Sequence, residues 1–175
     1  MAHSARYTGE WDGENKHGKG KLEWKNGTSY DGEFSQGKIH GKGKVFYGDD
    51  NSWYEGKFVE DKKHGFGHLQ WAETTFYDGN FNKDQMHGQG KLTTPQFTYD
   101  GEWQNSQKHG TGKLVMSDGS TYNGEWENDM REGLGTSNWA DGSMYIGDYR
   151  ANKKQGEGTF TWPDKWVYDG DWEGD

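Results

Sequence analysis

Histidine is the residue type in this sequence with the clearest capacity for chemistry. Five of the seven histidines recur at one position, 22–24 residues apart: His17, His40, His64, His87 and His109. Such a row invites a metal-site interpretation, because neutral imidazole is a common metal ligand. We call each stretch of 22–24 residues that contains one such position a copy. If each copy forms a β-hairpin, the histidines of consecutive copies lie about 9.6 Å apart. Two imidazoles that bind one zinc ion would each place a nitrogen about 2.0–2.1 Å from the metal. The spacing therefore predicts no metal site, and we expect these histidines to hydrogen-bond to their turns.

Acidic and basic residues also recur together. The matching pairs are Glu10 with Lys21, Glu33 with Lys44, and Glu102 with Lys113. We expect them to form cross-strand ion pairs of modest energy. In the third copy Lys57 replaces the acid and His68 replaces the lysine, which supports the pairing. Because these carboxylates repeat along the chain instead of occurring once, they do not indicate a catalytic dyad.

No nucleophile or phosphate-binding motif is present. The sequence lacks Gly-x-Ser-x-Gly, His-Glu-x-x-His and a Walker sequence. Its Gly-x-Gly triplets, such as Gly18-Lys19-Gly20, fall within strand-like alternation and not before a helix. We therefore expect a protein that is not an enzyme by itself and that uses no cofactor.

The elements that position these residues follow from a second pattern, Tyr-x-Gly-x-aromatic, which occurs eight times. Its tyrosines are Tyr7, Tyr30, Tyr54, Tyr77, Tyr99, Tyr122, Tyr145 and Tyr168. A fixed period of this length indicates stacked copies of one small unit. From each tyrosine to the first glycine of Gly-x-Gly is always eleven residues, and length varies only near the end of a copy. The constant part predicts a β-hairpin and the variable part a connecting turn.

Both halves of each copy alternate with period two, as strands do. In the first copy Tyr7, Gly9 and Trp11 share one face, while Thr8 and Glu10 share the other. The glycines therefore face the same way as the aromatic rings. We interpret this as a ring lying flat over a backbone that has no side chain; the alternative is that the glycines mark β-bulges.

Tyr-x-Gly-Glu-Trp, followed by His-Gly-x-Gly-x-Leu and then Asp-Gly, resembles the MORN repeat (membrane occupation and recognition nexus). The resemblance implies an all-β fold: an elongated, twisted, single-layer antiparallel sheet of tandem β-hairpins, a MORN repeat solenoid. Glu132, Gln155 and Ser137 depart from the pattern near the C-terminus. We expect an N-terminal extension over 1–6 and a single array of seven and a half repeats over 7–175. The copies span 7–29, 30–53, 54–76, 77–98, 99–121, 122–144, 145–167 and 168–175.

Composition excludes several classes of protein. Only 28% of residues are hydrophobic, but the 28 aromatic residues argue against disorder because they concentrate in the repeat positions. The absence of cysteine excludes a secreted disulfide scaffold, and no signal peptide or transmembrane run is present. The net charge is −9, and residues 122–175 carry 12 acidic against 5 basic residues. Nucleic acid is therefore not expected as a partner.

Two surfaces are candidates for binding a protein partner. The first is a groove on the aromatic face, in which a helix or extended peptide could lie. Its predicted residues, six positions before the next tyrosine in most copies, are Trp24, Tyr47, Trp71, Thr94, Met116, Trp139 and Trp162. The alternative is that these rings only pack on their neighbours.

The second surface is an apolar patch on the otherwise polar face. Its predicted residues, which have the opposite parity to the aromatic row, are Phe46, Trp53, Phe66 and Phe76. This patch could serve self-association. The alternative is a local cluster that only stiffens the sheet.

These observations favour a non-catalytic scaffold that presents the aromatic groove to a protein partner. The MORN resemblance implies a cytoplasmic, cytoskeleton-associated structural protein, in a cilium, flagellum or axoneme, or at the cell cortex. A first alternative is a module that binds acidic phospholipid through Lys19, Lys21, Lys42 and Lys44. A second is the regulatory repeat region of a larger enzyme.

Overall fold

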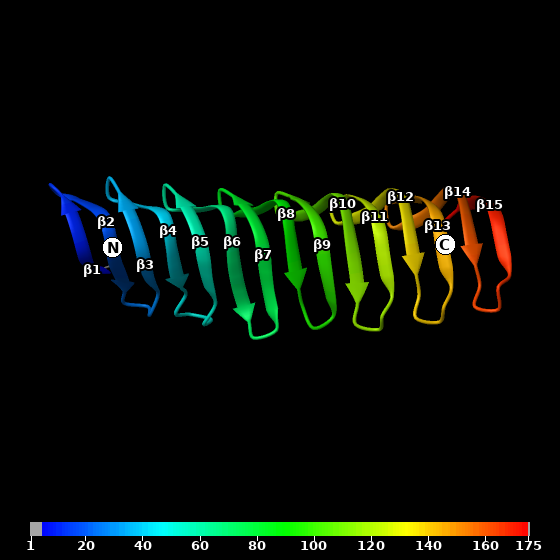
Figure 1. Ribbon diagram of the computed structural model, residues 1–175, viewed down its shortest axis with the longest axis horizontal. Coiled ribbons are helices and arrows are strands. Elements are labelled where there is room, and N and C mark those ends of the chain that lie inside the picture. Colours follow the sequence, from blue (N-terminus) through cyan, green and yellow to red (C-terminus); the bar gives the residue numbers. More distant parts are fainter. Residues whose placement is uncertain (1–4, 175) are drawn as a thin grey trace. The chain divides into compact units, whose positions relative to one another are not determined.

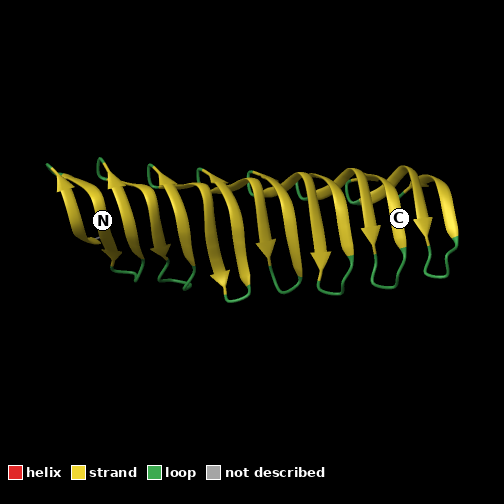
Figure 2. Cartoon of the chain, viewed as in Figure 1, coloured by secondary structure: helices red, strands yellow, loops and turns green. Residues whose placement is uncertain are grey.

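The computed structural model describes residues 5–174 as strands and turns without a helix (Figure 2). Residues 1–4 of the expected extension, and Asp175, lie outside the described residues. The strands are β1 (Ala5–Asp12), β2 (Asn15–Trp24), β3 (Ser29–Ser35), β4 (Lys38–Phe46), β5 (Trp53–Val59), β6 (Lys62–Ala72), β7 (Thr75–Asn82), β8 (Gln85–Thr93), β9 (Phe97–Gln104), β10 (Gln107–Met116), β11 (Thr121–Glu127), β12 (Met130–Asn138), β13 (Met144–Arg150), β14 (Lys153–Thr161) and β15 (Val167–Glu173).

The strands form one open sheet in chain order, which confirms the predicted all-β sheet of tandem hairpins. The chain divides into two compact units, residues 1–86 and 87–175, and β8 contributes to both. Within each unit consecutive strands lie side by side and antiparallel, and the turns alternate between the two sheet edges (Figure 1). Because each strand bonds only to its chain neighbours, every site in a unit is built from consecutive copies.

The core of each unit is a row of tyrosine rings lying on glycine. Tyr30 is fully buried, and its ring covers Gly32 and Gly43, where an added Cβ would collide with it. The Tyr30 hydroxyl donates a hydrogen bond to the Glu33 carbonyl oxygen at 3.0 Å. Phe34 packs against the Tyr30 ring edge-to-face at a centroid distance of 5.2 Å. The interpretation of ring over glycine is thus confirmed at these two positions, and the equivalent glycines of five further copies meet their tyrosine in the same way.

The first glycine of each Gly-x-Gly has a different role. Gly41 has a φ of 67°, and the β3–β4 register shifts between Gly32 and Phe34. The bulge interpretation therefore holds for this glycine. At the bulge the Lys42 N–H donates to Glu33 Oε2 at 3.3 Å.

The predicted pairing of these glutamates with lysine is wrong. In the β1–β2 and β2–β3 registers Lys21 lies opposite Thr8 and Asp31, not opposite Glu10. Its ammonium bonds to Glu23 at 2.7 Å, and Lys44 bonds to Glu55 at 3.2 Å. The recurrent glutamate instead caps a backbone N–H that the register shift leaves outside the ladder.

A second recurrent contact joins each hairpin to the preceding one. The Asp129 N–H donates to the Lys108 carbonyl oxygen at 3.1 Å, and the Lys108 N–H donates to Asp129 Oδ1 at 2.9 Å. Asp84 makes the same two bonds with Lys63. Asp129 can reach back because it lies in a two-residue turn with a φ of 68°. We call this two-bond contact the turn staple.

The histidines do not bond to their turns as predicted. None of the five recurrent imidazole rings makes a hydrogen bond within residues 5–174, and His109 Nδ1 is buried without a partner. The residue that bonds to a turn is the one immediately before the histidine, which belongs to the turn staple. No group of three or more potential metal ligands occurs in the described part of the chain.

Candidate functional site

A groove on the aromatic face of the second unit is one of two candidate sites. Two adjoining cavities, of about 370 and 430 Å³, share Arg131 and Trp139 in their linings. The first extends to Leu114 and Met116, and the second extends to Phe160. We call these two cavities together the C-terminal groove. The two cavities lie next to each other over β10 to β14, because their linings share two side chains.

Cationic side chains lie over the aromatic rings of this groove. Lys108 Nζ is 5.2 Å from the Trp126 ring centroid, and the Arg131 guanidinium carbon is 5.0 Å from the Tyr149 ring centroid. Lys154 Nζ is 4.6 Å from the Trp172 ring. Such contacts keep a cation close to an apolar surface while leaving its charge available.

Sequence reasoning missed this row of cations, although a signal was present. The residue immediately before the histidine position is cationic in five of the seven copies: Lys16, Lys63, Lys108, Arg131 and Lys154. Its parity places it on the aromatic face.

Arg131 differs from Lys63 and Lys108 in its pairing. Lys63 and Lys108 each lie within 4 Å of the staple aspartate, at 3.7 Å from Asp84 and 3.3 Å from Asp129. At Arg131 the staple residue is Asn152, whose carbonyl oxygen accepts a hydrogen bond from Nη2 at 2.8 Å. Arg131 therefore has no ion pair within residues 5–174 and leaves a positive charge in the middle of the groove.

The structure separates the predicted groove residues by role. Met116 and Trp139 line the same cavity, and Trp162 contacts Phe160 at a centroid distance of 4.7 Å. Thr94 instead closes a turn, because its Oγ1 donates to the Phe97 carbonyl oxygen at 3.0 Å and accepts from the Gln96 N–H at 3.2 Å.

The three predicted groove residues of the first unit have different surroundings. The Tyr47 hydroxyl accepts a hydrogen bond from Lys63 Nζ at 3.2 Å. Trp71 is exposed, and Trp24 is half-buried.

The four residues of the predicted second patch lie on the polar face of the first unit. Trp53 stacks on His68 at a centroid distance of 4.8 Å, and His68 stacks on Phe76 at 5.5 Å. Phe46 lies opposite Trp53. Phe66 has 66% of its surface exposed. Trp53 and Phe76 thus belong to a local ring cluster with His68, while Phe66 faces solvent.

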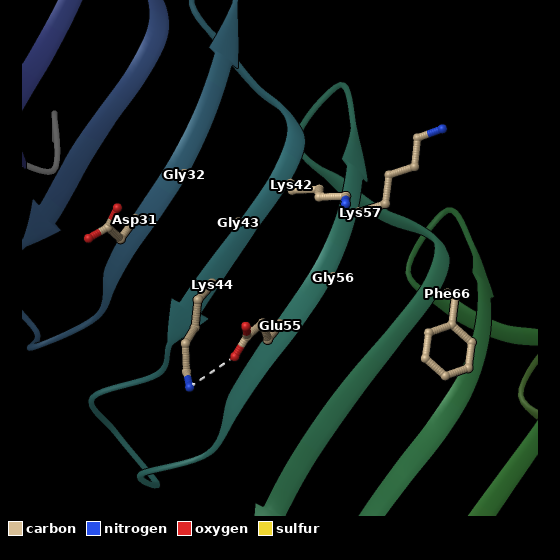
Figure 3. A pocket seen from close by; sticks show the side chains of 9 residues that line it. All are labelled: Asp31, Gly32, Lys42, Gly43, Lys44, Glu55, Gly56, Lys57 and Phe66. Atoms are coloured by element: carbon tan, nitrogen blue, oxygen red, sulfur yellow. Dashed lines mark ion pairs between the residues drawn. The ribbon is translucent and has the colours of Figure 1, made fainter.

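A pocket of about 430 Å³ adjoins Phe66, and Figure 3 shows the side chains around it. It lies over the glycine backbone of β3 to β6 and is lined by Asp31, Lys42, Lys44, Glu55, Lys57 and Phe66. The Lys44–Glu55 ion pair crosses it. We call it the polar-face pocket.

The four lysines of the lipid hypothesis differ in whether a glutamate pairs with their ammonium group. Lys21 and Lys44 are engaged by glutamates, as described above. Lys42 lines the polar-face pocket, and Lys19 lines a separate depression beside His17. No helix within residues 5–174 has the length and apolar character needed to cross a membrane.

Comparison of the sequence with protein families identifies the repeat. The MORN repeat matches seven segments: 7–29, 30–52, 54–74, 77–96, 99–121, 122–144 and 145–167. The chain belongs to the MORN repeat family. The Tyr-x-Gly strand and the Gly-x-Gly strand that follows it are therefore the two strands of one MORN hairpin. No curated protein matches the chain at a significant level.

Solved structures with a similar fold include two related domains. The TCP domain of SAS-4 (dCPAP) from Drosophila melanogaster, in complex with a proline-rich motif of Ana2 (dSTIL), has a TM-score of 0.52 and 17% identity, covering 94% of this chain and 88% of that one. The TCP10 domain of Danio rerio CPAP has a TM-score of 0.43 and 14% identity, covering 100% and 94%. At these identities the likeness concerns the fold.

Proposed function

We propose that this MORN protein is a non-catalytic scaffold whose C-terminal groove binds a peptide segment of a protein partner. The observation that carries the proposal is the pair of adjacent cavities whose linings share Arg131 and Trp139. Aromatic grooves of this kind bind extended or proline-rich segments through ring faces, with a few polar groups that set orientation. Arg131, which lacks an ion pair in the described residues, supplies such a group.

The similarity to the SAS-4 TCP domain supports a peptide as the ligand. That domain, which has a similar fold, was solved with a proline-rich motif. An extended proline-rich segment is therefore our first candidate, and an amphipathic helix is the second. By its family resemblance we place the scaffold in a cytoskeletal assembly, such as a cilium or flagellum.

The lipid alternative is less favoured. Two of its four lysines already bond to glutamates. The net charge of the chain is −9, which opposes attraction to an anionic membrane.

Site-specific photo-crosslinking in the native cell tests the proposal. Met116, in the groove, is replaced by p-benzoylphenylalanine, and Lys113 of the same strand, which has the opposite parity, is replaced in a control chain. We expect a crosslinked partner peptide from position 116 that is weakened by Trp139→Ala and Arg131→Gln. Crosslinking of the same partner from position 113 alone would contradict the proposal.

A further inference from the structure

The recurrent glutamate of the MORN hairpin closes a small anion site. In four hairpins its carboxylate accepts a hydrogen bond from the N–H that follows the bulge glycine. These bonds join Lys19 to Glu10 at 3.1 Å, Lys42 to Glu33 at 3.3 Å, Thr111 to Glu102 at 3.0 Å, and Leu134 to Glu125 at 3.3 Å. Each of these hairpins therefore supplies its own carboxylate ligand to its own backbone donor.

The hairpin β5–β6 departs from this arrangement. Lys57 stands where the glutamate stands elsewhere, and Phe66 is the residue that follows the bulge glycine, Gly65. The β5–β6 register passes from Gly56–Gly67 to Phe58–Lys63, so Phe66 has no partner residue in β5. Within residues 5–174 no side chain accepts from the Phe66 N–H. The donor that four sister hairpins bond to a carboxylate thus has no side-chain acceptor here, and a ligand carboxylate can take that position.

Three lysines and two acids, Asp31 and Glu55, line the pocket, so its charged side chains sum to a positive charge that favours an anion. Lys42 lies directly opposite Lys57 in the β4–β5 register, and neither lysine has an ion pair in the described part of the chain. Like charges at opposed positions repel each other. The stem of Lys57 lies over Gly65, and its ammonium extends away from the Lys44–Glu55 pair (Figure 3).

The pocket also offers an apolar surface beside the donor. The ring of Phe66 is 66% exposed and lines the same pocket as Lys42 and Lys57. The floor of the pocket is formed by Gly32, Gly43 and Gly56, which have no side chains that could cover the Phe66 ring. A ligand with an acidic group next to an apolar one matches both features.

We propose that the polar-face pocket binds an aspartate or glutamate side chain from an acidic peptide segment of a protein partner. The carboxylate takes the place that glutamate holds in the sister hairpins. It accepts a hydrogen bond from the Phe66 N–H between the ammonium groups of Lys42 and Lys57, and an apolar neighbour in the peptide packs on the Phe66 ring. This site is on the opposite sheet face from the aromatic row and does not depend on the proposed peptide groove.

The test is a titration of the isotope-labelled chain followed by NMR, with the tripeptide acetyl-Leu-Glu-Leu-amide as the probe. We expect saturable shifts of the Phe66 amide and of the Lys42 and Lys57 side chains. The isosteric acetyl-Leu-Gln-Leu-amide should bind at least tenfold more weakly. Equal responses to the two peptides, or an unmoved Phe66 amide, would overturn the proposal. So would stronger binding of inorganic phosphate or of phosphatidylserine vesicles than of the glutamate peptide.

A single substitution separates loss of the site from loss of the fold. Lys57→Glu installs the residue found in four sister hairpins, so the chain should remain folded while its own carboxylate fills the site. We expect this variant to bind the glutamate peptide at least tenfold more weakly. Lys113→Glu makes the same charge change at a position outside the pocket and should bind as the unmodified chain does. Unchanged affinity in Lys57→Glu, or equal losses in both variants, would contradict the proposal.

Discussion

At the scale of single residues, the two glycines of a Gly-x-Gly triplet have different structural roles. Gly43 lies under the Tyr30 ring, whereas Gly41, two residues earlier, has a φ of 67° at a bulge. The first must be glycine because a side chain has no space, and the second because L-residues rarely adopt this backbone conformation.

Gly43→Ala is expected to destabilise the first unit by about 1–3 kcal/mol, the range of overpacking substitutions. The added Cβ would meet the ring and hydroxyl of Tyr30, which are held by the Glu33 carbonyl. Urea unfolding measures the change. Gly119→Asn is the control, because Gly119 has a φ of 88° with nothing within 4 Å and asparagine tolerates this conformation. Equal losses in the two variants would contradict the ring-over-glycine account.

Glu102→Ala should remove the cap of the Thr111 N–H and destabilise the second unit by about 0.5–1 kcal/mol, a value reduced for solvent exposure. The hydrogen bond from the Thr111 N–H lowers the pKa of the Glu102 carboxyl. Stability from a lowered carboxyl pKa is present above the unfolded value, about 4.3, and is lost as pH falls through the folded value. The difference between the variant and the unmodified chain should therefore shrink below about pH 4, which urea unfolding across pH can establish.

At the scale of elements, the turn staple couples consecutive hairpins that would otherwise meet only through ladder bonds and ring contacts. The Asp129 carboxylate accepts a hydrogen bond from the Lys108 N–H and also forms an ion pair with the Lys108 ammonium group on the aromatic face. The turn staple thus both stabilises the contact between consecutive hairpins and holds a cation of the groove in position. In the copy with Asn152 the backbone bonds remain, while the charge pairing of Arg131 is lost.

Asp129→Ala is expected to cost about 1–2 kcal/mol, because the Lys108 N–H loses its acceptor and alanine is disfavoured at a φ of 68°. Asp129→Asn should retain most of the stability, as Asn152 makes the same bond at 2.8 Å. Hydrogen exchange of the Lys108 amide reports the bond directly. Slow exchange of this amide in the alanine variant would show that the staple does not protect it.

At the scale of the whole molecule, the repeated tyrosines make the free energy of unfolding vary with pH in the alkaline range. Burial raises the pKa of Tyr30, Tyr54, Tyr77, Tyr99 and Tyr122, and it raises that of Tyr145 to about 12. In an unfolded chain tyrosine ionises near pH 10. The unfolded state therefore releases protons first as pH rises.

The free energy of unfolding should be nearly constant up to about pH 10 and then fall steeply towards pH 12, because several tyrosines contribute. Urea unfolding at increasing pH, with tyrosinate absorbance followed in parallel, measures this. Tyr145→Phe should reduce the slope by one group while lowering stability at neutral pH, since the hydroxyl bonds to the Asp148 carbonyl oxygen at 3.0 Å. Tyrosine ionisation near pH 10 in a chain that remains folded would contradict the prediction.

The period of the tyrosines was enough to predict fifteen strands, their pairing in chain order and the face on which the rings lie. These features depend on local patterns, alternation and turn residues, which a sequence displays directly. The sequence also placed Phe46, Trp53, Phe66 and Phe76 on the polar face, where the structure has them. Met116 and Trp139, two of the predicted groove residues, line one cavity, whereas Thr94, predicted in the same groove, closes a turn.

Only the tertiary structure decided which groups the recurrent glutamate and lysine side chains bond to. The β1–β2 register changes by two residues at the bulge, and the recurrent glutamate there meets a backbone N–H and not the expected lysine. At the same bulge of β5–β6 no side chain within residues 5–174 accepts from the Phe66 N–H, because Lys57 replaces glutamate. By itself the sequence determined the repeating hairpin, because its causes are local. The two candidate sites depend on side chains from successive hairpins meeting in space, which the register and the turn staple control.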